Sequence, residues 1–189
     1  MKFFKSLLWI ALTCSLSTAQ TFNLGQNVFF NEEGVINLAV DAAVAVRNLD
    51  SPYVMFMLFM GADEGAIANI SRDNILLVHN NQTYKMPSFK EFRKNYNKDN
   101  LDLNLYKRLG KDSLILSKMR WYRFQTAYDF FPARGQNVRI TDEGEIVGRE
   151  GFQTKAYFKN PGFKAGDKII IKVIDTKNSE IWGAAAVEL

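Results

Sequence analysis

Eight consecutive residues, Tyr53 to Met60, are apolar or aromatic, and none of them carries a charged or amide side chain. The run follows the turn residues Asn48-Leu49-Asp50-Ser51-Pro52 and ends at Gly61. A short apolar run bounded in this way is typical of a strand that is covered on both faces. Such a strand needs one layer of structure above it and another below it. The remaining segments of the chain must therefore supply two covering layers.

The segment that follows Ser88 is a candidate for one of these layers. Ser88 and Glu91 form the S-x-x-E pattern of a capping box, which predicts that a helix begins here. Three aromatic residues follow at the spacing of one helical face: Phe89, Phe92 and Tyr96. We expect this helix to lie against the Tyr53–Met60 strand, with its aromatic face inward.

Alternating hydrophobicity predicts strands in the rest of the chain. The run Val35 to Val46 has a period of two, with one strongly apolar face and one face of small side chains, and predicts a strand over its whole length. Asn80-Asn81 predicts a hairpin turn, because Asn tolerates positive φ. Further strands are predicted at 75–78, 83–86, 153–158, 168–175 and 180–189. The run Leu101 to Leu109 fits either a helix or a strand.

These elements predict a β-dominated α+β protein: an antiparallel β-sandwich with one or two short helices inserted around residues 88–110. Gly166-Asp167-Lys168, which leads into an apolar strand, resembles the way strands begin in immunoglobulin-like sandwiches. We therefore expect an immunoglobulin-like architecture. This resemblance concerns architecture and implies no particular site.

The first nineteen residues have the parts of a secretory signal peptide. Lys2 and Lys5 form a positive start, and an apolar run follows. Ser17-Thr18-Ala19 then places small residues before an expected cleavage at Gln20. We expect an exported protein, periplasmic or extracellular, with residues 1–19 as the signal peptide.

The expected cleavage removes Cys14, the only cysteine, so that residues 20–189 can form no disulfide. A segment of this length can be stable on its hydrophobic core alone, and we expect a single β-sandwich-like domain. Lipoprotein anchoring through Cys14 is not expected, because Thr13 stands where such signals want Gly or Ala. After cleavage no segment has the length of apolar sequence that a transmembrane helix needs.

Charge and composition exclude several classes of function. Two of the 24 basic residues lie in the signal peptide, which leaves 22 against 20 acidic residues, with no arginine-rich stripe. Nucleic-acid binding is therefore not expected. His79 is the only histidine, so neither a zinc site nor a Ser-His-Asp set is predicted, and no cofactor is expected. Acid–base chemistry by two carboxylates stays open, with Asp41 and Asp142-Glu143-Gly144-Glu145 as candidates. A structural partner and a turn are the simpler interpretations of these residues.

One segment combines arginines with aromatic rings, a mixture that stacks on sugars and peptides. Its members are our candidate ligand-binding residues: Arg120, Trp121, Tyr122 and Arg123. The alternative is a strand whose rings belong to the core while its arginines face water.

Three functions follow from this reasoning. The first is an exported, non-catalytic binding or interaction module whose partner is a protein or a cell-envelope component. The second is a protein that binds a small apolar ligand or a carbohydrate through Trp121, Tyr122 and the Met-rich Tyr53–Met60 strand. The third is a carboxylate-dependent hydrolase. Asn69 and Asn81 begin glycosylation patterns, which do not decide between the three.

Overall fold

The computed structural model describes residues 20–189, and the predicted signal peptide lies outside the described residues. The larger of two main sheets contains, in spatial order, β1 (Phe22–Gly25), β2 (Val28–Asn31), β3 (Ile36–Asp41), β4 (Tyr53–Ala62), β12 (Glu150–Lys159), β11 (Glu143–Val147) and β5 (Ile67–Ser71), with β8 (Arg123–Gln125) also beside β12. The smaller sheet contains β14 (Trp182–Glu188), β13 (Lys168–Ile174), β6 (Ile75–His79) and β7 (Gln82–Lys85). A short parallel ribbon joins β9 (Tyr128–Asp129) to β10 (Arg139–Ile140).

Helices make up a smaller part of the described chain: α1 (Ala43–Arg47), α2 (Phe89–Asn95), α3 (Asp99–Leu109), α4 (Asp112–Lys118) and the 3-10 turn η1 (Arg72–Asn74). All pairs within the two main sheets are antiparallel except β8 with β12. The predicted strand-rich α+β class with antiparallel sheets is confirmed. The immunoglobulin-like architecture stays a prediction. None of the described helices has the length and apolar character needed to cross a membrane.

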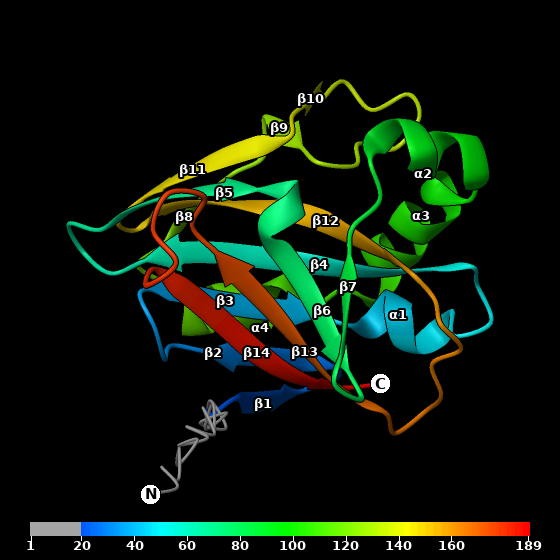
Figure 1. The fold of residues 1–189 in the computed structure, drawn as a ribbon, viewed down its shortest axis with the longest axis horizontal. Helices are drawn as coiled ribbons and strands as arrows, with labels where there is room; N and C mark the ends of the chain where they lie inside the picture. Colours follow the sequence, from blue (N-terminus) through cyan, green and yellow to red (C-terminus); the bar gives the residue numbers. More distant parts are fainter. Residues whose placement is uncertain (1–19) are drawn as a thin grey trace, which may run out of the picture.

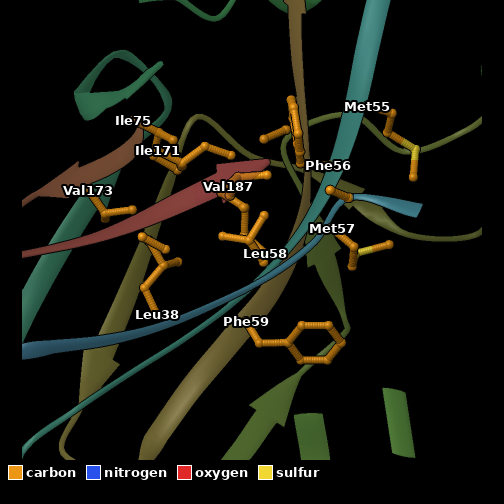
Figure 2. Packing of buried hydrophobic residues seen from close by; sticks show 14 of the residues in the cluster. Leu38, Met55, Phe56, Met57, Leu58, Phe59, Ile75, Ile171, Val173 and Val187 are labelled. Atoms are coloured by element: carbon orange, nitrogen blue, oxygen red, sulfur yellow. The ribbon is translucent and has the colours of Figure 1, made fainter. Parts of the chain in front are cut away.

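Strand β4 lies at the centre of the larger sheet, between β3 and β12, and all of its residues are buried. One face of β4 meets the smaller sheet, which lies over the larger sheet in Figure 1. In Figure 2, Leu58 points toward Ile171 and Val187 of the smaller sheet, whereas Met57 and Phe59 point the other way. The first covering layer required by the sequence is therefore a second sheet.

The second covering layer includes α2. The Ser88 side chain accepts a hydrogen bond from the Glu91 backbone N–H at 3.1 Å, so the predicted capping box starts the helix. The Phe92 ring is fully buried, and its centroid lies 5.6 Å from that of Tyr53 on β4 and 4.3 Å from that of Tyr157 on β12. The expected contact between this helix and the central strand is confirmed.

The structure also tests the predicted Asn80-Asn81 turn and the run Leu101 to Leu109, which fitted either a helix or a strand. Asn80 and Asn81 have φ of 49° and 61° and join β6 to β7, as the hairpin prediction requires. The leucine-containing run forms α3, so the helical alternative is the correct one. One or two helices were predicted around residues 88–110, and two are present, α2 and α3; α1 and α4 were not predicted.

The strand predicted from Val35 to Val46 is wrong in its second half. Strand β3 ends at Asp41, and α1 follows from Ala43. The Asp41 carboxylate accepts a hydrogen bond from the Ala43 backbone N–H at 2.8 Å, which turns the chain at the end of the strand. Because alanine is the best helix former, the alanine-rich segment continues as a short helix once the chain has turned. Period-two hydrophobicity alone did not reveal this change.

We predict that Leu58→Ala lowers the free energy of unfolding by about 2–5 kcal/mol, because it opens a cavity between the two sheets. Leu116→Ala is the matched control, since Leu116 is 46% exposed on α4 and its truncation should change stability by no more than about 0.5 kcal/mol. Urea unfolding of both variants measures the difference. Equal effects of the two substitutions would contradict the central role of β4.

Candidate functional site

A cleft of about 620 Å³ opens between α1 and α3, which lie near one another at the helical end of the molecule in Figure 1. Its volume falls in the range of small-molecule sites. We call it the α1–α3 cleft, and its lining residues are Arg47, Asn48, Asp50, Ser51, Tyr96, Lys98, Leu101, Asp102, Asn104, Leu105 and Arg108. The lining combines charged, amide, hydroxyl and apolar groups.

Two hydrogen bonds fix the walls of the α1–α3 cleft. Asp41, before α1, accepts from the backbone N–H of Lys111, which follows α3, at 2.8 Å. Asn48, after α1, donates its side-chain N–H to Asp102 in the first turn of α3 at 2.9 Å. The start of α1 thus meets the end of α3, and the end of α1 meets the start of α3. The two helices are therefore antiparallel and tied at both ends.

Helix α3 turns polar groups inward. Leu101 is 63% exposed, whereas Asp99, Asp102 and Tyr106 are buried. The buried residues have the i, i+3, i+7 spacing of one helical face. Sequence reasoning followed the leucines and so missed this face, although the spacing of the two aspartates and the tyrosine carried the signal.

Asp102 is the centre of a hydrogen-bond network at the floor of the α1–α3 cleft. Its carboxylate accepts from the Tyr96 hydroxyl at 2.7 Å, from the Tyr157 hydroxyl at 3.2 Å and from Asn48 at 2.9 Å. The Tyr96 hydroxyl also lies 3.2 Å from the Ser51 hydroxyl. Burial raises the pKa of Asp102 above its ordinary value and outweighs the three hydrogen bonds, which lower it. All three of these donors are uncharged.

The two tyrosines of this network remain hydroxyl donors at neutral pH. Burial raises the pKa of Tyr96, and its hydrogen bond to the Asp102 carboxylate raises it further. Burial also raises the pKa of Tyr157, and the nearby Asp102 charge adds to the effect. Because Tyr157 lies on β12 and Tyr96 at the end of α2, the network joins the sheet, α2 and α3 at one point.

Asp99 forms a second buried link beside the first. Its carboxylate accepts from the Arg93 guanidinium at 2.7 Å and from the Arg134 backbone N–H at 2.8 Å. The Arg93 guanidinium also donates to the Pro132 carbonyl at 2.6 Å. Asp99 and Arg93 therefore tie α2 and α3 to the segment that follows β9.

The cations of the α1–α3 cleft are different from those of the Asp99 link. Arg47, Lys98 and Arg108 are exposed at the rim, and within residues 20–189 none of them forms an ion pair. Asp50 is also exposed at the rim. The side-chain partners of Asp102 are Tyr96, Tyr157 and Asn48, so its charge is not balanced by a direct contact with the cations.

The four residues predicted to bind a ligand lie outside the α1–α3 cleft. Trp121 is 64% exposed, and the Arg120 guanidinium lies 4.7 Å from its ring centroid. Tyr122 is half-buried and stacks on Phe124, while Arg123 is exposed on β8. The Met-rich strand does not complete this group, because Met55 and Met57 are buried in the core.

The candidate carboxylates have structural surroundings. Asp41 is buried, and its two oxygens accept from the backbone N–H groups of Ala43 and Lys111. Burial raises the pKa of Asp41 above its ordinary value. Asp142 pairs with Arg72 at 2.5 Å. The turn expected at Asp142–Glu145 is wrong, since 143–147 forms β11, which pairs with β5.

A second buried pair, which sequence reasoning also missed, lies on β12. The Lys155 ammonium, 2% exposed, donates to the Asp129 carboxylate, which also accepts from the Thr154 hydroxyl at 2.8 Å. Gln136 lies 3.3 Å from the same ammonium. The pair borders a small cavity of about 110 Å³. The pair holds residues 128–138 against one edge of β12. On that edge β11 pairs with β12 at Val147 and Glu150.

Within residues 20–189, no group of three or more His, Cys, Asp or Glu side chains is arranged to hold a metal ion. Comparison of the chain with protein-family models, with curated proteins and with solved structures finds no match. The candidate site is therefore defined by its own geometry: a rigid cleft with a hydroxyl-rich floor and a cationic rim.

We predict that Asp102→Asn flattens the pH dependence of stability. The pKa of Asp102 lies above 3.8 in the folded protein, so its contribution to stability is fully present below that pH and is lost as pH rises through the folded value. Urea unfolding at steps between about pH 4 and pH 7 should show a smaller fall for the variant than for the wild type. An unchanged profile would contradict the buried, uncompensated state of this carboxylate.

The pKa of Asp175 is shifted in the opposite direction from that of Asp102. Although burial raises its pKa, hydrogen bonds from the backbone N–H groups of Asn69, Lys177 and Asn178 lower it more, and the net pKa is below 3.8. Its contribution to stability is present above pH 3.8 and is lost as pH falls through the folded value. Asp175→Asn should therefore destabilise the protein at neutral pH by about 1–3 kcal/mol and much less in acid.

A separate prediction concerns the buried pair of Lys155 and Asp129. Asp129→Ala should lower stability by about 3–5 kcal/mol, because it leaves a buried ammonium without its partner. The double variant Asp129→Ala with Lys155→Met removes that charge and should recover part of the loss. Chemical unfolding of the two variants measures the recovery. If the double variant is no more stable than Asp129→Ala alone, the unpaired charge is not the cause of the loss.

Proposed function

We propose that this chain is an exported, non-catalytic binding protein and that its ligand site is the α1–α3 cleft. The observation that carries the proposal is the cleft itself, a hollow of about 620 Å³ whose floor is a fixed network of hydroxyl and amide groups. A ligand in this cleft would be a small polar molecule, because most of the lining can form hydrogen bonds.

Preorganisation supports a binding function. Asn48, Tyr96 and Asp102 hold one another in place before any ligand arrives, so little side-chain freedom remains to be lost on binding. The hydrogen bonds at both ends of α1 and α3 give the walls the same rigidity. Sites built on helices in this way are more exact than sites built on free loops.

This proposal is nearest to the second of our three hypotheses, binding of a small ligand, but its ligand is polar and its site is not the one expected at Trp121 and Tyr122. Trp121 and Arg120 form an exposed stacked pair on the surface, without a cavity of their own among the hollows described above. That geometry suits a weak contact with a flat partner better than the enclosure of a small molecule. We therefore place the ligand in the α1–α3 cleft.

The hydrolase hypothesis would have to use the two carboxylates of the same cleft, Asp50 and Asp102. A raised pKa suits a general acid, and Asp102 has one. However, both Asp102 oxygens accept hydrogen bonds from Asn48, Tyr96 and Tyr157, which favours a fixed structural group over one that exchanges protons with a substrate. Binding is therefore the function that the geometry supports best.

We predict that Leu101→Trp blocks the α1–α3 cleft. Leu101 is exposed on its wall, so the larger ring can occupy the hollow without disturbing the core. Small polar fragments would be screened against the ¹⁵N-labelled protein by NMR, and hits that shift the cleft amides should bind at least about tenfold more weakly to Leu101→Trp, a loss of 1.4 kcal/mol.

Leu116→Trp is the matched control, because Leu116 is an exposed leucine on α4 that does not line the cleft. It should bind the same fragments as the wild type does. If no fragment shifts the cleft amides, or if both tryptophan variants bind equally well, the proposed location of the site is wrong.

A further inference from the structure

We infer that Lys155 and Asp129 join through an isopeptide bond, an amide between the two side chains, which the folded chain forms by itself. The site lies on β12 and β9, and the inference goes beyond the proposed function because it does not involve the α1–α3 cleft. The buried ion pair of these two residues is the arrangement that precedes the reaction.

The Lys155 pair differs from the other ion pair that a lysine forms within residues 20–189. The side chains of Lys118 and Glu32 are 37% and 53% exposed, and their charged atoms lie 3.9 Å apart. The side chains of Lys155 and Asp129 are 2% and 11% exposed. Two charges removed from water carry a desolvation cost that neutral groups do not carry. Transfer of a proton from the ammonium to the carboxylate, which leaves both groups neutral, is therefore favoured at the buried pair.

The two side-chain oxygens of Asp129 have different surroundings. Oδ1 accepts hydrogen bonds from the Thr154 hydroxyl at 2.8 Å and from the backbone N–H groups of Lys155 and Phe131 at 3.1 Å each. Oδ2 is in contact with the Lys155 ammonium. Donors directed at one oxygen stabilise the negative charge that develops there when a nucleophile attacks the adjoining carbon. Oδ1 is thus placed to remain as the amide oxygen, and Oδ2 is placed to leave.

The reaction needs no further reactant. After the ammonium of Lys155 has given one proton to Oδ2, its neutral nitrogen attacks the Cγ atom of Asp129 and forms the new N–C bond. A second proton passes from this nitrogen to Oδ2, the Cγ–Oδ2 bond breaks, and Oδ2 leaves as water. One ammonium and one carboxylate become one amide and one water, so atoms and charges balance. The cavity of about 110 Å³ that borders the pair has room for the released water.

The surroundings of the pair also suit the product. The amide oxygen keeps the three donors of Oδ1, and the amide N–H faces the Gln136 side-chain oxygen, which lies 3.3 Å from the Lys155 nitrogen. Both polar groups of the amide therefore have partners, as buried polar groups require. Groups held together in one fold react with an effective molarity of up to about 10⁵–10⁸ M, which favours the amide over its hydrolysis.

The bond gives the chain a cross-link that cysteine does not supply. Residues 20–189 contain no cysteine, whereas exported domains often depend on disulfides. Asp129 lies on β9, and Lys155 lies on β12, which pairs with the central strand β4. The link therefore closes a loop from residue 129 to residue 155 and fixes it to the larger sheet. A closed loop restricts the unfolded chain and so stabilises the folded one.

Tryptic peptide mapping of the purified and denatured full chain tests the bond. Trypsin does not cut after a lysine whose side chain is an amide, so residues 124–134 and 150–159 should appear as one branched peptide. Its mass should be about 18 Da below the sum of the two peptides, because one water is lost. Tandem mass spectrometry then assigns the link to Lys155 and Asp129. If trypsin cuts after Lys155 and peptide 124–134 appears alone, the inference is overturned.

Three variants complete the test. Lys155→Met and Asp129→Ala should each abolish the branched peptide. Lys118→Met is the matched control, because it removes the lysine of the exposed ion pair, and it should retain the branched peptide. A link from Lys155 to Gln136 with loss of about 17 Da, the mass of ammonia, would overturn the assignment to Asp129. The map of the wild type decides the matter even where a variant fails to fold.

Discussion

The burial of β4 on both faces is the constraint on which the rest of the structure depends. A strand with Leu58 on one face and Phe59 on the other cannot sit at the surface, and each buried side chain of this size contributes about 1.5–3 kcal/mol on burial. The smaller sheet meets the first face, and α2 with its Phe92 ring meets part of the second. The long connection from β7 to β8 contributes to that second layer. This connection contains three helices, α2, α3 and α4.

The candidate site lies where the aromatic residues and α3 both contribute to this second layer. The aromatic residues Phe92, Tyr96 and Phe131 already cover the Tyr53 and Tyr157 rings at one end of the sheet. Helix α3 adds the Tyr106 ring to the core and turns Asp99 and Asp102 inward toward hydroxyl, amide and guanidinium donors. Two of its leucines, Leu101 and Leu105, lie in the wall of the cleft. A polar floor below a partly apolar wall is the result.

The sequence was informative wherever one local rule decided the conformation. The Ser88–Glu91 box and the Asn80-Asn81 turn depend only on neighbouring residues, and both are present. The double burial of Tyr53–Met60 followed from a run too apolar for any exposed face. By contrast, the helix at Ala43 depends on Asp41, whose second oxygen is held by Lys111, seventy positions along the chain. Long-range hydrogen bonds of this kind leave no mark in hydrophobic periodicity.

The same difference explains why the candidate site was not found from the sequence. An inward helical face is usually recognised by its leucines, whereas the inward face of α3 carries Asp99, Asp102 and Tyr106. The pairing of Asp129 with Lys155 joins two segments that no motif connects. The aromatic segment at Trp121 drew attention because its residues are adjacent in the chain, and in the structure Trp121 and Arg120 form an exposed stack.

A buried carboxylate is a poor way to hold a helix in place. Apolar residues of similar volume often stabilise a fold as well as or better than a buried polar or charged network does. Burial raises the pKa of both Asp41 and Asp102, which means that the fold opposes their charged forms at either end of α1. Local departures of this kind from the most stable arrangement gather at functional sites. Here they fix the two walls of one cleft, and at its rim two arginines stay without an ion-pair partner in the described chain. Stability alone does not require such a combination, which agrees with the binding site that we propose.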